Sequence, residues 1–223
     1  MTDLCDRLEL NWTFIKGSDC SPTYLGTNIS HLRAYRHDQA KPPFLILEDD
    51  CEVTEYYSNP LEIPTDADIV YLGVSSCGIA PALGGRALEG AVIVTDFSEQ
   101  LCRVHNMTSA HAVLYVTEKA QQLAIEQSLL CTIDRFWPFD VGLAEIQSQL
   151  NAYAYKKPML YQANALQGKD KQFMEKMTKI DLGKIPVRET MKTAVDNNVH
   201  FFKLTETEKG RWQWVLMGKP KES

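Results

Sequence analysis

Long hydrophobic runs are absent from this sequence of 223 residues. No apolar stretch approaches the roughly 20 residues that a helix needs to cross a bilayer. The first residues also lack the basic start and the apolar core of a signal peptide. We therefore expect a cytosolic (cytoplasmic) protein without a transmembrane segment. A content of 44% hydrophobic and 23% charged residues further excludes a disordered or fibrous chain.

Metal-binding and redox patterns of cysteine are also missing. The six cysteines form no C-x-x-C pair, so the spacing favours neither a zinc site nor a dithiol redox site. In a cytosolic chain we expect these thiols to be reduced and mostly buried.

Positive charge is scarce in most of the chain. The net charge is −6, but residues 1–150 carry 9 Lys and Arg against 21 Asp and Glu, whereas residues 151–223 carry 14 against 8. An anionic partner such as nucleic acid would therefore bind the basic C-terminal region. A lysine-rich solvated surface is the simpler explanation, and the overall acidity makes nucleic acid the less favoured partner.

Short apolar runs that end in turn residues predict an α/β fold. Such runs indicate strands at 11–17, 44–47, 69–72 and 112–116. Helical composition between polar or proline-containing stops indicates helices at 30–40, 118–130 and 140–150. Because strands alternate with helices in this part of the chain, we expect a mostly parallel sheet flanked by helices.

The composition changes after this α/β region. Residues 168–183 are polar and rich in lysine, which is typical of a linker, and the glycine-rich residues 78–90 predict a loop. Beyond the linker, a short helix at 190–197 and a hairpin of strands at 200–204 and 212–217 are expected. We therefore divide the chain into a domain at 1–167 and a small basic α+β appendage at 168–223.

Three adjacent carboxylates follow the strand at 44–47. In strand geometry Glu48 and Asp50 point to one side and Asp49 to the other. Two oxygen ligands on one side suit Mg²⁺ or Mn²⁺, and strand ends in open α/β sheets are common ligand sites. A solvated acidic turn is the alternative explanation.

Three segments occur in a distinctive order: SHLRAYR at 30–36, LILEDD at 45–50 and DIVYLG at 68–73. Their order and spacing resemble glycosyltransferase family 25, the lipooligosaccharide and collagen β-galactosyltransferase group. That family reads roughly S-H-L-x-x-[WY], then L-I-L-E-D-D, then D-I-[VI]-Y-L-G. Weaker similarities follow in the segments TSAHAVLYVT at 108–117, PFD at 138–140 and KPMLYQ at 157–162. The resemblance covers about residues 12–165.

The resemblance implies a GT-A-like (Rossmann-like) fold and a nucleotide-sugar donor such as a UDP-hexose. It also implies Mn²⁺ or Mg²⁺ held by the acidic motif, here Glu48 and Asp50. The implied reaction is an inverting transfer of a hexose to a hydroxyl acceptor, which is a glycan, a protein or, less favoured, a modified nucleobase in DNA.

An inverting transfer needs a carboxylate that takes the proton of the acceptor hydroxyl. Asp140 is our first candidate because its apolar neighbours would raise its pKa, and an N-cap role at the same helix is the alternative. Asp134 is the second candidate for this base. We expect donor contacts from Ser30 and His31, which match the S-H pair of the family. Further donor-binding candidates are Asp49, Thr108, Ser109 and His111; for both histidines, packing inside the protein is the alternative role.

Three departures from the family support a second hypothesis. We find no counterpart of the family's opening strand with its arginine-bearing loop, no later histidine for the metal, and no counterpart of the C-terminal 40 residues. These departures favour the alternative of a non-catalytic nucleotide-sugar-binding or scaffold protein that retains a degenerate GT-A fold.

Overall fold

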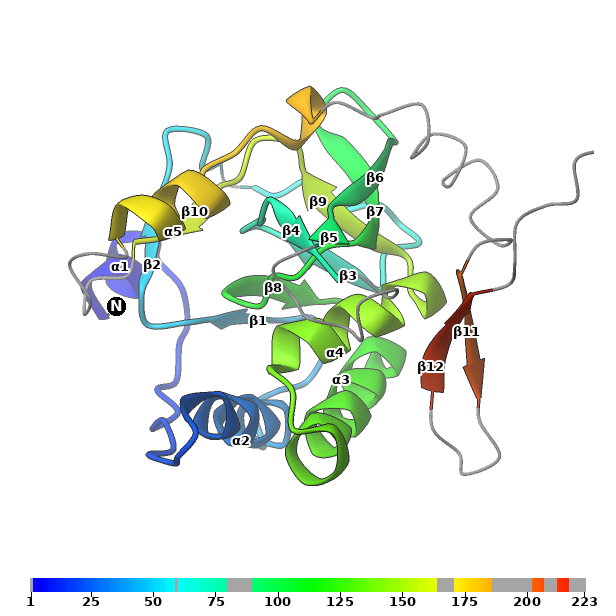
Figure 1. The fold of residues 1–223 in the computed structure, drawn as a ribbon. Helices are drawn as coiled ribbons and strands as arrows, with labels where there is room; N and C mark the ends of the chain where they lie inside the picture. Colours follow the sequence, from blue (N-terminus) through cyan, green and yellow to red (C-terminus); the bar gives the residue numbers. More distant parts are fainter. Residues whose placement is uncertain are drawn as a thin grey trace, which may run out of the picture.

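A mixed six-stranded sheet lies at the centre of the computed structural model (Figure 1). The structure describes residues 2–58, 60–79, 90–163, 171–185, 202–206 and 212–216. In spatial order the strands of the sheet are β1 (Phe44–Leu47), β8 (Ala112–Tyr115), β3 (Ile69–Tyr71), β9 (Ala152–Tyr155), β7 (Leu101–Asn106) and β6 (Ile93–Asp96).

The sheet is mostly antiparallel, so the prediction of a mostly parallel sheet is wrong. Only the neighbours β3 and β9 run in the same direction, whereas every other neighbouring pair in this sheet is antiparallel. Strands β7 and β8 run in the same direction, opposite to β3 and β9. Strand β8 follows β7 after a short connection without a helix and inserts between β1 and β3, where it is antiparallel to both. The α/β class itself is confirmed.

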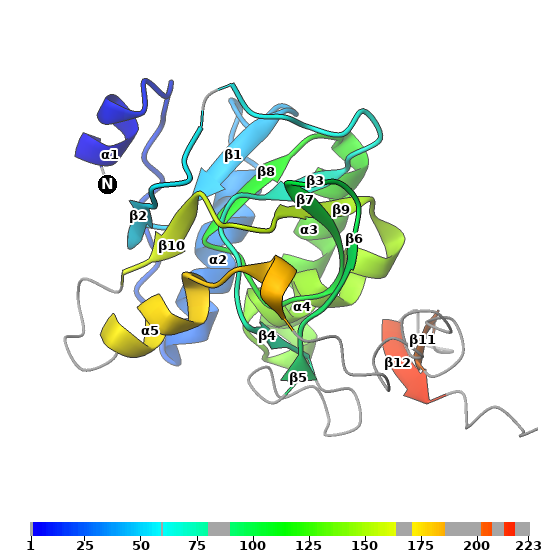
Figure 2. The same cartoon turned by 90° about the horizontal axis from the view of Figure 1, so that it is seen from above.

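Three helices cover one face of this sheet. They are α2 (Thr23–Tyr35), α3 (Glu118–Leu130) and α4 (Phe139–Ile146), and they lie together below the sheet in Figure 1 and behind it in Figure 2. Side chains alternate along β3, so Ile69 and Tyr71 pack in the core on this face while Val70 packs on the opposite face.

The opposite face is covered by smaller elements. The helix α1 (Thr2–Arg7) contributes Leu4 to this second core, beside the two-stranded sheet of β2 (Cys51–Val53) and β10 (Leu160–Gln162). The helix α5 (Lys171–Thr178) packs next to β10. The remaining elements are η2 (Cys131–Arg135), η3 (Gln147–Gln149), η4 (Leu182–Lys184), and the two hairpins β4 (Cys77–Gly78) with β5 (Gly90–Ala91) and β11 (Phe202–Glu206) with β12 (Trp212–Leu216).

Several predicted elements are confirmed. The strands at 44–47, 69–72 and 112–116 are β1, β3 and β8, and the helix at 118–130 is α3, which begins after the side-chain cap of Thr117. The predicted C-terminal hairpin corresponds to β11 and β12, which pair in antiparallel register.

Other predicted boundaries are wrong. Residues 11–17 form no strand, and the helix predicted at 30–40 is α2, which begins after Pro22 and ends at Tyr35. The helix predicted at 140–150 ends as α helix at Ile146 and continues as η3. The linker predicted at 168–183 contains α5 and most of η4. The helix predicted at 190–197 and most of the loop predicted at 78–90 lie outside the described residues.

The six cysteines are free thiols, and all but Cys20 are buried, as expected from the sequence. Within the described part of the chain, no helix is both long and apolar enough to cross a membrane.

The carboxylate of Asp68 joins three elements beside the start of β3. It accepts hydrogen bonds from the Asn151 backbone N–H (2.9 Å), the Thr117 hydroxyl (2.8 Å) and the Lys119 ammonium group (3.2 Å). Burial alone would raise the pKa of Asp68, but these hydrogen bonds and the charge of Lys119 lower it below its ordinary value. The ionised carboxylate therefore stabilises the fold.

We predict that Asp68→Ala lowers the free energy of unfolding by about 2 kcal/mol, because two partly buried donors, Thr117 and Asn151, lose their acceptor. Lys119→Ala, which removes an exposed partner, is the matched control and costs under about 1 kcal/mol. Denaturant unfolding measures both values. The contribution of Asp68 is present above its ordinary pKa near 4 and is lost as the pH falls through the lower pKa of the folded state. Equal losses for both variants at neutral pH would contradict this role.

Candidate functional site

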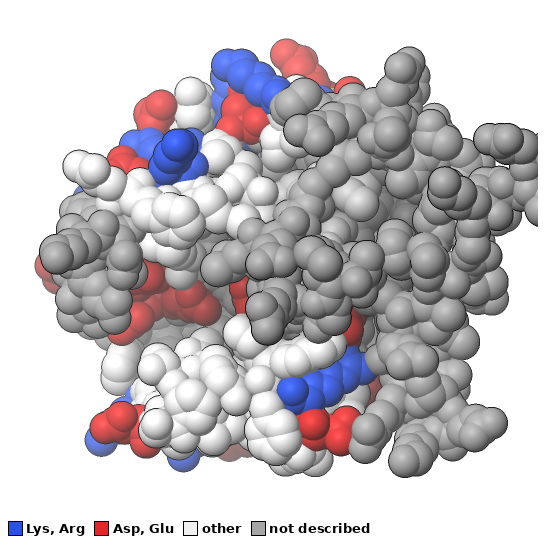
Figure 3. All heavy atoms as spheres, in the orientation of Figure 1, with Lys and Arg blue, Asp and Glu red and all other residues white. Residues whose placement is uncertain are grey.

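Acidic side chains gather in a hollow of the surface, on the face seen in Figure 1 (Figure 3). Glu48 and Asp50 lie in the turn that follows β1 and precedes β2. The backbone N–H of Glu48 donates to the carbonyl oxygen of His111 (2.8 Å), so this turn stays attached to the start of β8. The sheet edge therefore determines where the two carboxylates lie.

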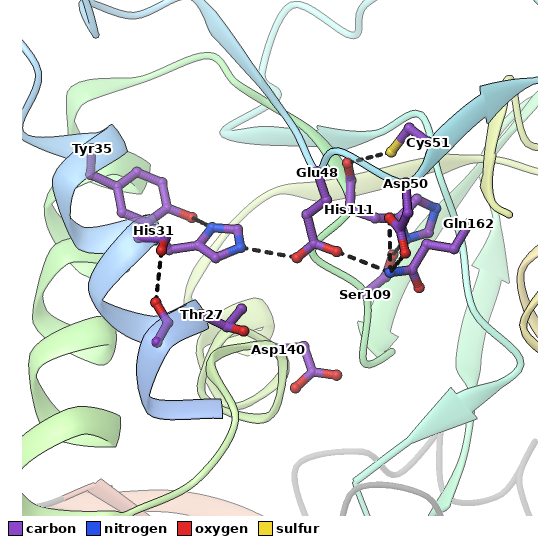
Figure 4. A network of polar contacts seen from close by, with 12 residues as sticks. Thr27, His31, Tyr35, Glu48, Asp50, Cys51, Ser109, His111, Asp140 and Gln162 are labelled. Atoms are coloured by element: carbon purple, nitrogen blue, oxygen red, sulfur yellow. Dashed lines mark hydrogen bonds and ion pairs between the residues drawn. The ribbon is translucent and has the colours of Figure 1, made fainter. Parts of the chain in front are cut away.

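Glu48 and Asp50 share one partner, the side-chain amide of Gln162 at the end of β10. The amide nitrogen Nε2 lies 2.9 Å from Glu48 Oε2 and 3.5 and 3.4 Å from the two carboxylate oxygens of Asp50 (Figure 4). Asp49 between them is exposed. The two carboxylates thus meet on one side of the chain, as strand alternation predicts.

The second oxygen of Glu48 is held by His31, which α2 carries. His31 Nε2 lies 3.0 Å from Glu48 Oε1, and an ionised carboxylate can only accept, so the imidazole is the donor. The ring stacks on Phe139 with centroids 4.7 Å apart. Tyr35, one turn later on α2, lies 3.5 Å from His31 Nδ1 and 2.5 Å from the hydroxyl of Tyr115. The imidazole is therefore held from several sides.

The two carboxylates differ in their electrostatic environment. Burial would raise the pKa of Glu48, but the hydrogen bond and charge of His31, with smaller contributions from His111 and Gln162, lower it. Burial, together with the adjacent charge of Glu48, raises the pKa of Asp50 to about 6. The site thus favours the ionisation of Glu48 and opposes that of Asp50.

Asp140 reaches the same site from the first turn of α4 (Figure 4). Burial, together with the charge of Glu48, raises the pKa of Asp140 to about 6, although the charge of His31 acts in the opposite direction. The alternative N-cap role is wrong, because the N-cap position belongs to Pro138 and Asp140 lies within the first turn, where its carboxylate accepts from the backbone N–H of Val141 (2.9 Å). The structure thus brings Asp140 into the field of the acidic pair.

His111, Ser109 and Thr108 lie beneath this pair and are buried. Burial lowers the pKa of His111 to about 4, so its ring is neutral at pH 7. The hydroxyls of Thr108 and Ser109 donate to the carbonyl oxygens of Cys77 (3.1 Å) and Gly73 (3.1 Å). All three side chains support the floor of the site, and their contact with a donor stays a prediction.

Two other predicted residues occupy different positions. The Ser30 hydroxyl donates to the carbonyl of Gly26 (2.7 Å) and accepts from the backbone N–H of Ser18 (2.9 Å), so it attaches the preceding loop to α2. Asp134 lies in η2, just before the segment that leads into α4. The roles of Ser30 in donor binding and of Asp134 as a base stay predictions.

Sequence reasoning missed Gln162 and Tyr35 as parts of the site. Gln162 ends the segment at 157–162 that resembles the family, and its place after a buried strand was the available signal. Tyr35 lies four residues after His31, which places both on one face of a helix. Neither signal shows which residues lie opposite them in space.

The donor set fits a hard divalent cation. The partly buried carboxylates of Glu48 and Asp50 share one amide group, and carboxylate and amide oxygens are ligands that Mg²⁺ and Mn²⁺ accept. Among the described residues, no group of three or more His, Cys, Asp and Glu side chains could hold a metal ion by itself. Any cation here therefore needs further ligands from an amide, water or a bound phosphate.

Comparison of the chain with protein-family models, with curated proteins and with solved structures finds no match. Function is therefore inferred from the geometry of this site and from the sequence motifs that form it.

The floor of the site depends on a close approach between Gly73 and His111. A Cβ atom at Gly73 would lie 2.1 Å from His111 Nε2, well inside contact distance. The backbone carbonyl of His111 in turn accepts from Glu48 and from the Cys51 thiol (2.9 Å). Only glycine at position 73 leaves the imidazole in its place.

We predict that Gly73→Ala lowers the free energy of unfolding by about 1–3 kcal/mol because it overpacks the core. Combined with His111→Ala, the loss is smaller than the sum of the two single losses, since the clash disappears. Gly17→Ala is the control, because its Cβ would meet only the Ser30 hydroxyl at 3.9 Å. Denaturant unfolding of the four variants tests this, and strictly additive losses would contradict the close approach as their cause.

Proposed function

We propose that this protein is an inverting, metal-dependent glycosyltransferase that moves a hexose from a nucleotide-diphosphate sugar to a hydroxyl acceptor. The observation that carries the proposal is that Asp140 lies within the electrostatic influence of Glu48, next to Asp50 in the acidic pair (Figure 4), although it is some ninety residues further along the chain. Partly buried carboxylates with shifted pKa values are typical of functional sites. The motif order at 30–36, 45–50 and 68–73, which resembles glycosyltransferase family 25, adds the reaction class.

Glu48 and Asp50 would hold Mn²⁺ or Mg²⁺ in this proposal. A bound divalent cation would act as a Lewis acid toward the departing nucleoside diphosphate, for which UDP is our candidate. His31 keeps Glu48 ionised and oriented through its 3.0 Å hydrogen bond. The protein thus presents a charged carboxylate beside a second one, Asp50, that a cation would help to ionise.

Asp140 would act as the base. Its carboxylate takes the proton of the acceptor hydroxyl while that oxygen forms the new bond to the anomeric carbon. The bond from this carbon to the phosphate oxygen breaks, and the nucleoside diphosphate leaves with the electron pair. Burial favours this role, since the raised pKa of Asp140, about 6, makes it a stronger base than an exposed aspartate.

The α/β class of the fold agrees with this proposal. An α/β sheet carries the acidic motif at the end of β1, and α2 and α4 supply His31 and Asp140 from one face. A GT-A-like relation, the division at residues 167 and 168, and a cytosolic location remain parts of the proposal. The alternative, a scaffold protein with a degenerate transferase fold, rests on the departures from the family: the missing opening strand and the missing later histidine for the metal.

We predict that Mn²⁺ and UDP together raise the melting temperature of the protein and that Asp50→Ala abolishes this rise, because one of the two carboxylates is removed. Glu55→Ala, which removes an exposed carboxylate after β2, is the control and keeps the response. Thermal shift measures the effect. No response of the wild type to any nucleotide with Mn²⁺ or Mg²⁺ would favour the scaffold protein over the enzyme.

We predict that Asp140→Asn retains stabilisation by Mn²⁺ and UDP but releases UDP from UDP-hexoses at least about 100-fold more slowly. The amide keeps the size of the side chain but cannot accept the proton. Slow hydrolysis of a panel of nucleotide sugars measures this without knowledge of the acceptor. Release at the rate of the wild type would remove Asp140 from the reaction and leave Asp134 to be tested in the same way.

A further inference from the structure

The amide of Gln162 occupies the position between two carboxylates where a cation would be attracted most. Its nitrogen faces Glu48 Oε2 at 2.9 Å and both oxygens of Asp50 at 3.4 and 3.5 Å. An amide nitrogen has two hydrogens for these three oxygens. Of the partners that the structure gives Glu48 and Asp50 at this point, this neutral donor is the one they share.

The backbone holds Gln162 at this position from both sides. In the pairing of β10 with β2, Gln162 lies opposite Cys51, next to Asp50, and the following residue Ala163 donates to the Asp50 carbonyl (2.9 Å). The Gln162 backbone N–H donates to the buried Thr178 hydroxyl of α5 (2.9 Å). Because these contacts fix the backbone at residue 162, the side chain of Gln162 is directed toward the two carboxylates.

The side-chain amide of Gln162 can bind the two carboxylates when no cation is present and can bind the cation when one is present. Rotation by half a turn about the last side-chain torsion exchanges Nε2 for Oε1 with almost no change of shape. Without a cation, the nitrogen faces the two carboxylates and reduces their repulsion. With a cation between them, the oxygen is favoured because it carries the partial negative charge, and amide oxygens are accepted ligands of hard divalent cations.

We infer that Gln162 is the third protein ligand of the divalent cation, through its amide oxygen, and that its nitrogen takes the place of the cation in the metal-free protein. This inference rests on the proposed function. Gln162 would take the place of the later metal-binding histidine that we do not find in the sequence. Two carboxylates and one amide oxygen leave positions for diphosphate oxygens and water, which suits Mg²⁺ or Mn²⁺.

The neighbouring histidines are poorer candidates for this ligand. His31 Nε2 is already committed to Glu48, and its Nδ1 faces Tyr35. His111 is 1% exposed, and its Nε2 packs against the backbone of Gly73. Neither ring can turn toward Asp50 without breaking contacts that hold the site, whereas the amide of Gln162 turns in place.

Titration with Mn²⁺, with the free ion measured by electron paramagnetic resonance, tests the ligand directly. Gln162→Met, which keeps the length of the side chain and removes both polar atoms, should weaken Mn²⁺ binding at least about tenfold. Gln162→Glu should bind Mn²⁺ at least as tightly as the wild type. Glu52→Gln is the charge control: Glu52 is paired with Tyr161 (2.8 Å), and its loss should leave the affinity unchanged.

The exchange of nitrogen for oxygen predicts a change of sign for Gln162→Glu. Without metal this variant should melt below the wild type, because a third carboxylate repels the other two. With saturating Mn²⁺ the deficit should vanish or reverse, because the added oxygen then binds the cation. If Gln162→Glu melts below the wild type by the same amount with and without Mn²⁺, only the amide nitrogen matters and the inference is overturned. This comparison does not depend on Gln162→Met and therefore holds even if that variant fails to fold.

The outcomes separate this inference from the proposed function. If the wild type binds Mn²⁺ and Gln162→Met binds it equally well, Gln162 is no ligand and the metal site stands without it. If the wild type binds neither Mn²⁺ nor Mg²⁺, with or without UDP, the metal-dependent function fails and this inference fails with it.

Discussion

Glu48 and Asp50 are held on one side of a single turn, where burial and their like charges oppose the ionisation of both. The two carboxylates differ in the hydrogen bonds that stabilise their charge. His31 binds Glu48 and keeps it charged, whereas Asp50 receives the longer contacts of Gln162. Asp140 adds a third carboxylate to the same field. The surrounding structure is arranged around this concentration of negative charge.

The groups that hold the acidic turn and its carboxylates come from different elements. His31 comes from α2, Gln162 from β10, and the carbonyl that anchors the acidic turn from His111 before β8. These elements meet because the sheet places β1 beside β8, while β2 continues from the same turn to pair with β10. Since the contacts converge on Glu48, loss of one of these elements would leave a partly buried charge with too few donors.

The sequence allowed some of this arrangement to be predicted and not the rest. Apolar runs between turn residues gave β1, β3 and β8 correctly, and the cap at Thr117 marks the start of α3. Strand direction was predicted wrongly, because a strand buried on both faces is apolar whether its neighbours are parallel or antiparallel. Gln162 was missed because its role depends on a pairing with β2 across more than a hundred residues, which no local pattern encodes.

The arrangement is costly for stability alone. A buried polar cluster stabilises a protein only where all its members are paired. An amide in place of the Asp50 carboxylate would avoid the repulsion by Glu48 and would keep a neutral contact with Gln162. A carboxylate at position 50 therefore does not serve stability. It is expected if a cation binds between Glu48 and Asp50, in the space that the amide of Gln162 faces, because both carboxylates would then coordinate the cation instead of repelling each other.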